Sequence, residues 1–142
     1  MATISSTEIS ALSAKTLASI ATANFAVLTS TQLGALTTAQ TGALTSSQIK
    51  VLSTAQIDGL STAQVAVLTS AQIGALTTDG IASFSTDQVA ALSAAGVAAL
   101  SSAQVSALST TQLNAFTTTQ LAALSSAAVA GLDTDDVATI SS

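Results

Sequence analysis

The stretch Leu60-Ser61-Thr62-Ala63-Gln64-Val65-Ala66-Val67-Leu68 decides the fold, because variants of it fill the chain with a period of eight residues. We number the unit from its leucine, so that position one is apolar, positions two and three carry hydroxyls, position five is glutamine and position six is again apolar. Recurrence of this kind indicates a repeat architecture rather than an ordinary globule. Position one recurs without insertion or deletion at Ile4, Leu12, Ile20, Leu28, Leu36, Leu44, Leu52, Leu60, Leu68, Leu76, Phe84, Leu92, Leu100, Leu108, Phe116, Leu124, Leu132 and Ile140.

Each unit carries the signature of a helix N-terminus. A Ser or Thr followed three residues later by Gln is a capping box, in which the hydroxyl accepts a backbone N–H and the amide reaches back to the N–H of the cap residue. The apolar residues at positions one and six flank this box and form a hydrophobic staple. Position two departs from Ser or Thr at Ala21 and Asp133, and position six departs from apolar residues at Thr41.

The repeat predicts an all-α solenoid of about seventeen very short capped helices, with residues 1–142 as a single octapeptide-repeat solenoid. A continuous helix is excluded, because its apolar positions would drift around the axis by about 80° in every eight residues. We expect helices of six or seven residues, each running to the next leucine and too short to be stable alone. A β-solenoid is the alternative, since Thr, Val and Ile also suit strands. The abundant Ala and the absence of period-two alternation argue against it.

The composition excludes several classes of function. Charged residues make up 6% of the chain, against roughly 25% in an average domain, and there is no Cys or His. Lys15 and Lys50 are the two basic residues, so the cationic footprint that nucleic acid requires is absent. We expect no enzymatic activity, no catalytic or metal-binding residue and no cofactor, because no nucleophile has a partner base. Hydroxyl pairs interrupt the apolar residues, which argues against a membrane span, and the N-terminus does not look like a signal peptide.

The densest charge lies at Asp133, Asp135 and Asp136. Three carboxylates so close together could attract a calcium ion. The alternative, which we favour, is that Asp133 is a helix cap and the other two occupy the first helical turn, where negative charge is stabilised. Gly80 and Gly96 replace the glutamine of position five, so their units lose the reach-back half of the capping box.

Stretches such as residues 60–68 and 108–116 resemble octapeptide tracts of large secreted bacterial repeat proteins that are described as adhesin-like or haemolysin-like. The resemblance extends over the whole chain and implies an extracellular or cell-surface role. It supplies no catalytic residue.

Three functional hypotheses follow, of which the third is that the chain is only a spacer within a much longer protein. The first is a structural module that associates with itself, head to tail or laterally, as a filament, or that forms a stalk. It follows from a solenoid whose ends expose apolar residues with few charges to oppose association. The second is a binding module whose stripe of Ser and Thr at position three recognises carbohydrate or ice.

Overall fold

The computed structural model describes residues 4–140 and folds them into seventeen short helices, with no strand in that range. The all-α solenoid is therefore confirmed, with one helix in each repeat. The helices are α1 (Ser6–Ala11), α2 (Ala14–Ala18), α3 (Thr22–Phe25), α4 (Ser30–Gly34), α5 (Thr38–Gly42), α6 (Ser46–Lys50), α7 (Thr54–Asp58), α8 (Thr62–Ala66), α9 (Ser70–Ala75), α10 (Thr78–Ala82), α11 (Thr86–Ala91), α12 (Ala94–Ala98), α13 (Ser102–Ser106), α14 (Thr110–Asn114), α15 (Thr118–Ala123), α16 (Ser126–Val129) and α17 (Thr134–Ile140).

The helices begin where the capping signature predicts. In α8 the hydroxyl of Ser61 accepts the backbone N–H of Gln64 at 3.2 Å, and the Gln64 side chain accepts the backbone N–H of Ser61 at 2.8 Å. Both halves of this capping box form in every unit with Gln at position five, and in α1, where Glu8 takes that place. Ala21, the cap of α3, has no side-chain oxygen and makes no such bond.

The helices end earlier than expected. Most have five residues, because the chain leaves the helix at position eight or one instead of continuing through the leucine. The leucine N–H still closes the last turn, as in the bond from Leu68 to the carbonyl of Val65 at 3.1 Å. The next cap residue then adopts an extended backbone, as Thr69 does, which starts a new direction. No described residue has a positive φ angle, so left-handed glycine caps do not end these helices.

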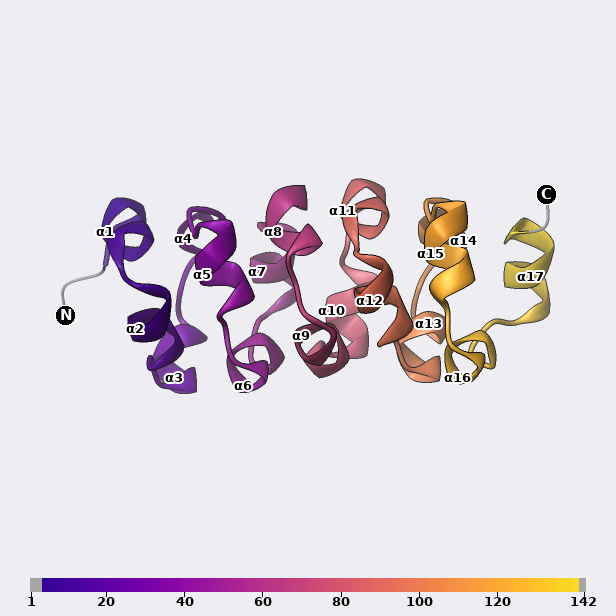
Figure 1. The fold of residues 1–142 in the computed structure, drawn as a ribbon, viewed down its shortest axis with the longest axis horizontal. Coiled ribbons are helices and arrows are strands. Elements are labelled where there is room, and N and C mark those ends of the chain that lie inside the picture. Colours follow the sequence, from indigo (N-terminus) through magenta and orange to yellow (C-terminus); the bar gives the residue numbers. More distant parts are fainter. Residues whose placement is uncertain (1–3, 141–142) are drawn as a thin grey trace.

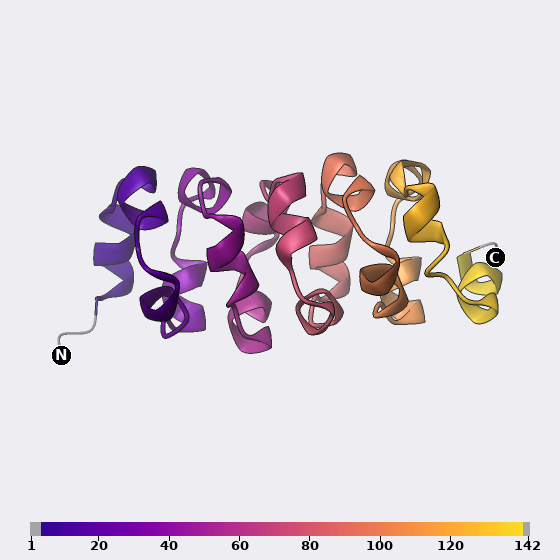
Figure 2. The same ribbon diagram turned by 90° about the horizontal axis from the view of Figure 1, so that it is seen from below.

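Three helices make one turn of the coil. Each helix packs against the third helix after it, so that equivalent positions on one side are three repeats apart. The result is a three-sided rod with the two ends of the chain at opposite ends (Figures 1 and 2). We call its sides the first stack (α1, α4, α7, α10, α13, α16), the second stack (α2, α5, α8, α11, α14, α17) and the third stack (α3, α6, α9, α12, α15).

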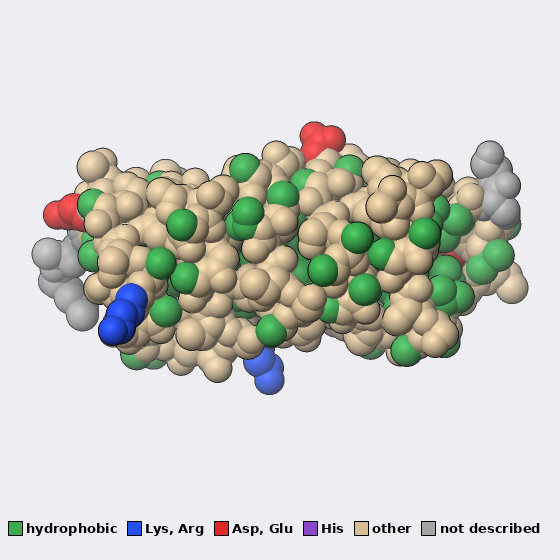
Figure 3. Space-filling view, in the orientation of Figure 1, with side chains coloured by type: hydrophobic (Ala, Val, Ile, Leu, Met, Phe, Trp, Pro, Cys, Tyr) green, Lys and Arg blue, Asp and Glu red, His purple; other side chains and the backbone are tan. Residues whose placement is uncertain are grey.

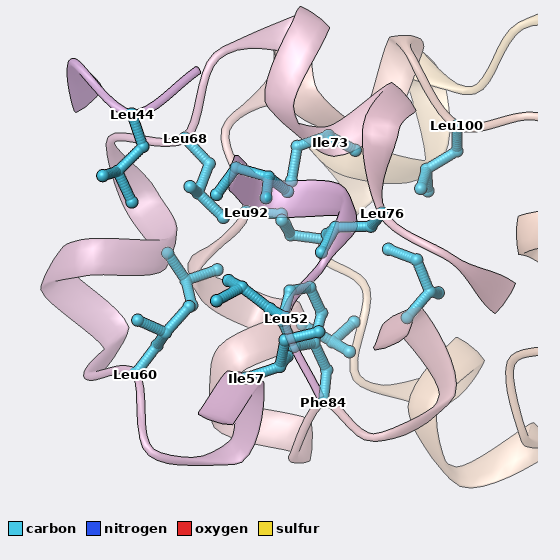
Figure 4. Packing of buried hydrophobic residues seen from close by; sticks show 14 of the residues in the cluster. Leu44, Leu52, Ile57, Leu60, Leu68, Ile73, Leu76, Phe84, Leu92 and Leu100 are labelled. Atoms are coloured by element: carbon cyan, nitrogen blue, oxygen red, sulfur yellow. The ribbon is translucent and has the colours of Figure 1, made fainter. Parts of the chain in front are cut away.

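The interior is a single apolar cluster that follows the axis of the rod. Positions one and six supply it, and side chains from successive turns meet there (Figure 4). Val65, Val89 and Val105 at position six are completely buried. Burial of one such side chain contributes roughly 1.5–3 kcal/mol to the stability of the folded state. A single unit would not fold alone, because its apolar side chains are buried only by contact with the neighbouring turns.

Candidate functional site

The hydroxyl and carboxylate side chains considered in the sequence analysis have local structural roles in the described residues. The Ser and Thr residues at position two are occupied as helix caps, and no group of three metal-ligating side chains occurs within residues 4–140. The acidic cluster has the local structural role that we favoured. Asp133 Oδ1 accepts the N–H of Asp136 at 2.9 Å, and Asp136 Oδ2 accepts the N–H of Asp133 at 3.1 Å, which reproduces a capping box with two carboxylates.

The most constrained polar side chain is the glutamine at position five. Its burial was not predicted, because we assigned it only to the capping box. Gln64 is 2% exposed, and its Oε1 accepts the cap N–H of Ser61. Its Nε2 donates to two carbonyl oxygens of the preceding turn, Leu33 at 2.7 Å and Leu36 at 2.9 Å. One amide therefore forms hydrogen bonds with a backbone N–H at the start of its own helix and with backbone carbonyls at the end of a helix four units earlier.

This glutamine bridge recurs with the same sequence separations. The Nε2 atoms donate to carbonyls 28 and, in most cases, 30 or 31 residues earlier, which occupy positions one, seven and six at the end of the helix four before. The position-six carbonyl also accepts the N–H of the following leucine, as the carbonyl of Leu33 does from Leu36, and the bridge adds a second donor at the helix end where a glycine cap would otherwise act. It is formed by Gln32, Gln40, Gln48, Gln56, Gln64, Gln72, Gln88, Gln104, Gln112 and Gln120.

The sequence carries no local signal for the bridge. A glutamine that completes a capping box is already explained by its own helix, and the carbonyls that its Nε2 reaches lie 28 to 31 residues away.

Two later units lack the bridge because position five is glycine. A Cβ atom at Gly80 would lie 2.8 Å from Cδ1 of Ile57, and one at Gly96 would lie 3.3 Å from Cγ1 of Ile73. The caps of these helices remain, since Thr77 and Ser93 accept the N–H groups of Gly80 and Gly96. The predicted loss of the reach-back half of the capping box is thus confirmed.

The two ends of the rod differ. At the N-terminal end Ile4, Leu12 and Ile20 are partly buried, and the position-five residues beside them are all exposed. Hydrogen bonds from Ser5, chiefly from its backbone N–H, hold the pKa of Glu8 below its usual value of 4.5. At the C-terminal end Val129 and Val137 are 47% and 52% exposed. Apolar side chains also gather at this end in the space-filling view (Figure 3).

The sides of the rod are polar but nearly uncharged. Positions two, three and four are exposed in most units, and few charged side chains appear on the face in view (Figure 3). One shallow depression lies between α7 and α10, lined by Thr54, Ala55, Asp58 and Ser83, without a nucleophile–base pair. None of the helices in residues 4–140 has the length and hydrophobicity needed to cross a bilayer.

The second stack carries a continuous row of threonines. The first residue of every helix in this stack after α2 is an exposed threonine, whereas the first stack mixes Ser and Thr at that place and the third stack has Ser, Thr and one Ala. The predicted stripe of Ser and Thr is therefore divided among the three sides of the rod. On the side formed by the second stack it consists of threonine from α5 to α17. The row consists of Thr38, Thr62, Thr86, Thr110 and Thr134.

A comparison with known families finds four overlapping matches to the family model described as the ALTTAQ repeat, at residues 17–53, 46–78, 73–102 and 81–118. Together they cover residues 17–118, which is 102 of the 142 residues. The segment Ala35-Leu36-Thr37-Thr38-Ala39-Gln40 spells this motif from position eight to position five. No curated protein and no solved structure matches the chain.

Proposed function

Because this chain belongs to the ALTTAQ repeat family, we propose that it is a non-enzymatic structural rod that holds the parts attached to its ends at a constant separation. The observation that carries the proposal is the glutamine bridge. Successive turns from α1 to α15 are joined by an apolar core and by buried, fully bonded amides, so the coil resists stretching as well as bending. A spacer requires this resistance to stretching and bending, and it does not require catalytic groups.

The regular unit also supports the proposal. A rod whose length is set by repeat number can be lengthened without redesign, because each turn contacts only its neighbours. The depression between α7 and α10 is lined by small polar and apolar side chains with a single carboxylate, that of Asp58.

The test is the distance between dyes attached near the two ends, measured by single-molecule energy transfer. We expect one narrow distance distribution. Deletion of residues 53–76, a whole turn that contains α7, α8 and α9, should shorten that distance while the helical circular dichroism per residue is kept. As a control, deletion of residues 53–64 breaks the phase of the repeat and should broaden the distribution. A broad distribution in the intact chain would contradict the proposal.

We further propose, from the resemblance to secreted repeat proteins, that the rod acts as a stalk or filament segment at a bacterial cell surface or in its matrix. The low content of charged residues, 6% of the chain, leaves little repulsion to oppose association with other copies. Fractionation of cells that produce the native protein tests the location. Recovery in the cytoplasmic fraction alone would contradict it.

A second candidate function is recognition of polysaccharide or ice, and the threonine row of the second stack favours it. Five hydroxyls and five methyl groups at equal intervals suit a ligand that is itself periodic. Replacement of Thr62 and Thr86 by Val should abolish thermal hysteresis or glycan binding. The matched control replaces Thr54 and Thr78, which occupy the same position on the first stack. Equal effects of both pairs, or neither activity in the parent chain, would exclude this function.

A further inference from the structure

The glutamine bridges are interrupted in the middle of the rod. Each bridge joins a helix to the end of the helix four before it, so the position-five residues of four helices span any boundary between two successive helices. At the boundary between α5 and α6 all four are glutamines that form the bridge. At the boundary between α8 and α9 they are Gln72, Gly80, Gln88 and Gly96, of which the two glutamines form it. The middle of the rod is therefore joined by half as many amides.

The first side of the rod is also packed less closely in the same turn. Between α4 and α7 the backbones approach so closely that a Cβ atom at Gly59 would lie 2.6 Å from the Cβ atom of Ser30. One turn later the same two positions hold Ser83 and Thr54, which both have larger side chains. For this reason α10 cannot approach α7 as closely as α7 approaches α4. The shallow depression lies at this junction, with Asp58 among its lining residues.

The third side of the rod is held together in the same turn. The hydroxyl of Ser70 donates to the carbonyl of Ala95 at 3.1 Å and so links α9 to α12. On the first side the hydroxyl of Ser83 donates instead to the carbonyl of Gly80 at 2.8 Å, at the end of its own helix. The missing bridge of α12 is thus accompanied by a direct bond between turns, whereas the hydroxyl at the end of α10 bonds locally.

The missing bridge of α16 is a contrasting case. Ala128 takes the place of the glutamine there, but the helix is followed by Gly131. A Cβ atom at Gly131 would overlap the carbonyl oxygen of Ser102, so α16 packs closely against α13. A lost amide and a wide junction therefore coincide at α10 and not at α16.

We propose that the junction of α7 with α10 is an opening point of the rod, where the first side separates under tension or in mild denaturant while the contact of α9 with α12 acts as the hinge. Regions of a fold with fewer stabilising contacts open at a lower free energy than the whole. The buried side chains of Ile57 and Ile81 keep the junction closed in the unloaded rod. Under load the rod bends at one fixed place before its helices unfold, and it closes when the load is removed. This inference rests on the proposed structural role and adds where the rod yields first.

The test compares two sides of the rod by distances between spin labels, measured by pulsed electron paramagnetic resonance. Labels attached through Ala55→Cys and Ala103→Cys lie on the first side, across the junction. Labels attached through Ala71→Cys and Thr119→Cys occupy the same exposed position on the third side, at the same separation of 48 residues. Urea, at concentrations below the loss of helical circular dichroism, should lengthen and broaden the first-side distance and leave the third-side distance unchanged. Removal of the urea should restore the first-side distance.

A repaired junction should open less. Thr54→Ser/Ser83→Gly recreates the residues found between α4 and α7, so the lengthening of the first-side distance in urea should be reduced. The matched control is Thr62→Ser/Ala91→Gly, at the same positions of the α8 and α11 units on the second side. It should leave the first-side lengthening as it is in the parent chain.

Two results would overturn the inference. Equal lengthening on the first and third sides, or no lengthening before the helices unfold, would show that the rod has no preferred opening point. An unchanged first-side lengthening in Thr54→Ser/Ser83→Gly would show that the junction does not set it. Should this variant lose helical circular dichroism, Ile57→Val/Gly80→Gln replaces it, because it restores the amide by another route, and the same reduction decides. The dye measurement tests the rod without urea, so its outcome is independent of these results.

Discussion

The side chain of Gln64 lies against the backbone of Leu36, with Nε2 donating to the carbonyl oxygen at 2.9 Å across 28 residues of sequence. Oε1 of the same amide accepts a hydrogen bond from the backbone N–H of Ser61. A single buried side chain thus couples the beginning of one helix to the end of another, and it does so in ten of the units. The stability of the rod should therefore depend on the chemistry of this group more than on its size.

Replacement of Gln64 by Ala should lower the free energy of unfolding by about 1–3 kcal/mol, because the N–H of Ser61 and the carbonyl of Leu36 lose this partner in the interior, while the carbonyl of Leu33 keeps only its bond from the N–H of Leu36. Replacement by Glu should cost more at neutral pH, since the carboxylate can accept from Ser61 but would face the carbonyls of Leu33 and Leu36 as a buried charge. Acidification should reduce that extra loss, because the neutral acid can donate. Denaturant titration followed by circular dichroism measures these changes.

The control for Gln64 is Ala63→Glu, which introduces the same charge one residue earlier on the exposed side of α8. We expect it to change the free energy of unfolding by less than about 0.5 kcal/mol. If Gln64→Glu lowered the free energy of unfolding no more than the control does, the bridge would not contribute to the stability of the rod.

Gly96→Gln should stabilise the rod by about 1 kcal/mol from helix propensity alone, with a further gain if the amide bonds to the carbonyls of Val65 and Leu68. Gly80→Gln should gain less, because its Cβ would lie 2.8 Å from Cδ1 of Ile57. Ile57→Val removes that methyl group, so the gain from Gly80→Gln should be larger when both substitutions are combined. Thermal unfolding of the parent, the two single variants and the double variant measures the coupling, and strictly additive effects would contradict the steric explanation.

Thr41 is a hydroxyl residue at a core position, and it is completely buried. Its Oγ1 donates to the carbonyl of Thr37 at 2.9 Å, a carbonyl that also accepts the N–H of Thr41. Thr41→Val should therefore stabilise by about 1 kcal/mol, since a methyl group replaces the hydroxyl and the carbonyl keeps its backbone partner. The reciprocal change Val65→Thr should destabilise by a similar amount. A loss of stability in Thr41→Val, measured by denaturant unfolding, would show that the hydroxyl bond outweighs the methyl group.

Glu8 should make the first helix sensitive to acid. Its pKa is lower in the folded chain than the unperturbed 4.5, because the backbone N–H and then the hydroxyl of Ser5 stabilise the carboxylate. The contribution to stability is thus complete above the unfolded pKa and is lost as the pH falls through the folded pKa. Nuclear magnetic resonance of the Ser5 amide should show α1 fraying in acid. Glu8→Gln should remove this pH dependence, and an unchanged Ser5 signal in the parent chain across the titration would contradict the assignment.

The octapeptide unit could be derived from sequence because capping is local. The register of Ser61, Gln64 and Val65 places one helix start in every repeat, and the structure confirms it. The number of helices in a turn could not be derived. It depends on the backbone angles where one helix passes to the next, as at Val67 with φ −96° and ψ 0°, and most residue types can adopt such angles.

The bridge was missed for a related reason. A glutamine that completes a capping box looks fully explained by its own helix, although its amide has a second, unused end. The shared partner of Gln64 lies 28 residues away, and a period of eight residues carries no information about a contact between distant units.

The core repeats with every octapeptide, whereas each side of the rod repeats only with every third one. A gene that gained or lost one octapeptide would keep every interior contact type, yet each later repeat would move to the neighbouring side of the rod. Thr62, Thr86 and Thr110 would then no longer align with Thr38. Exterior patterns can therefore be reshuffled by small genetic steps that leave the interior intact, and a lineage that preserves one threonine row must change its length by whole turns.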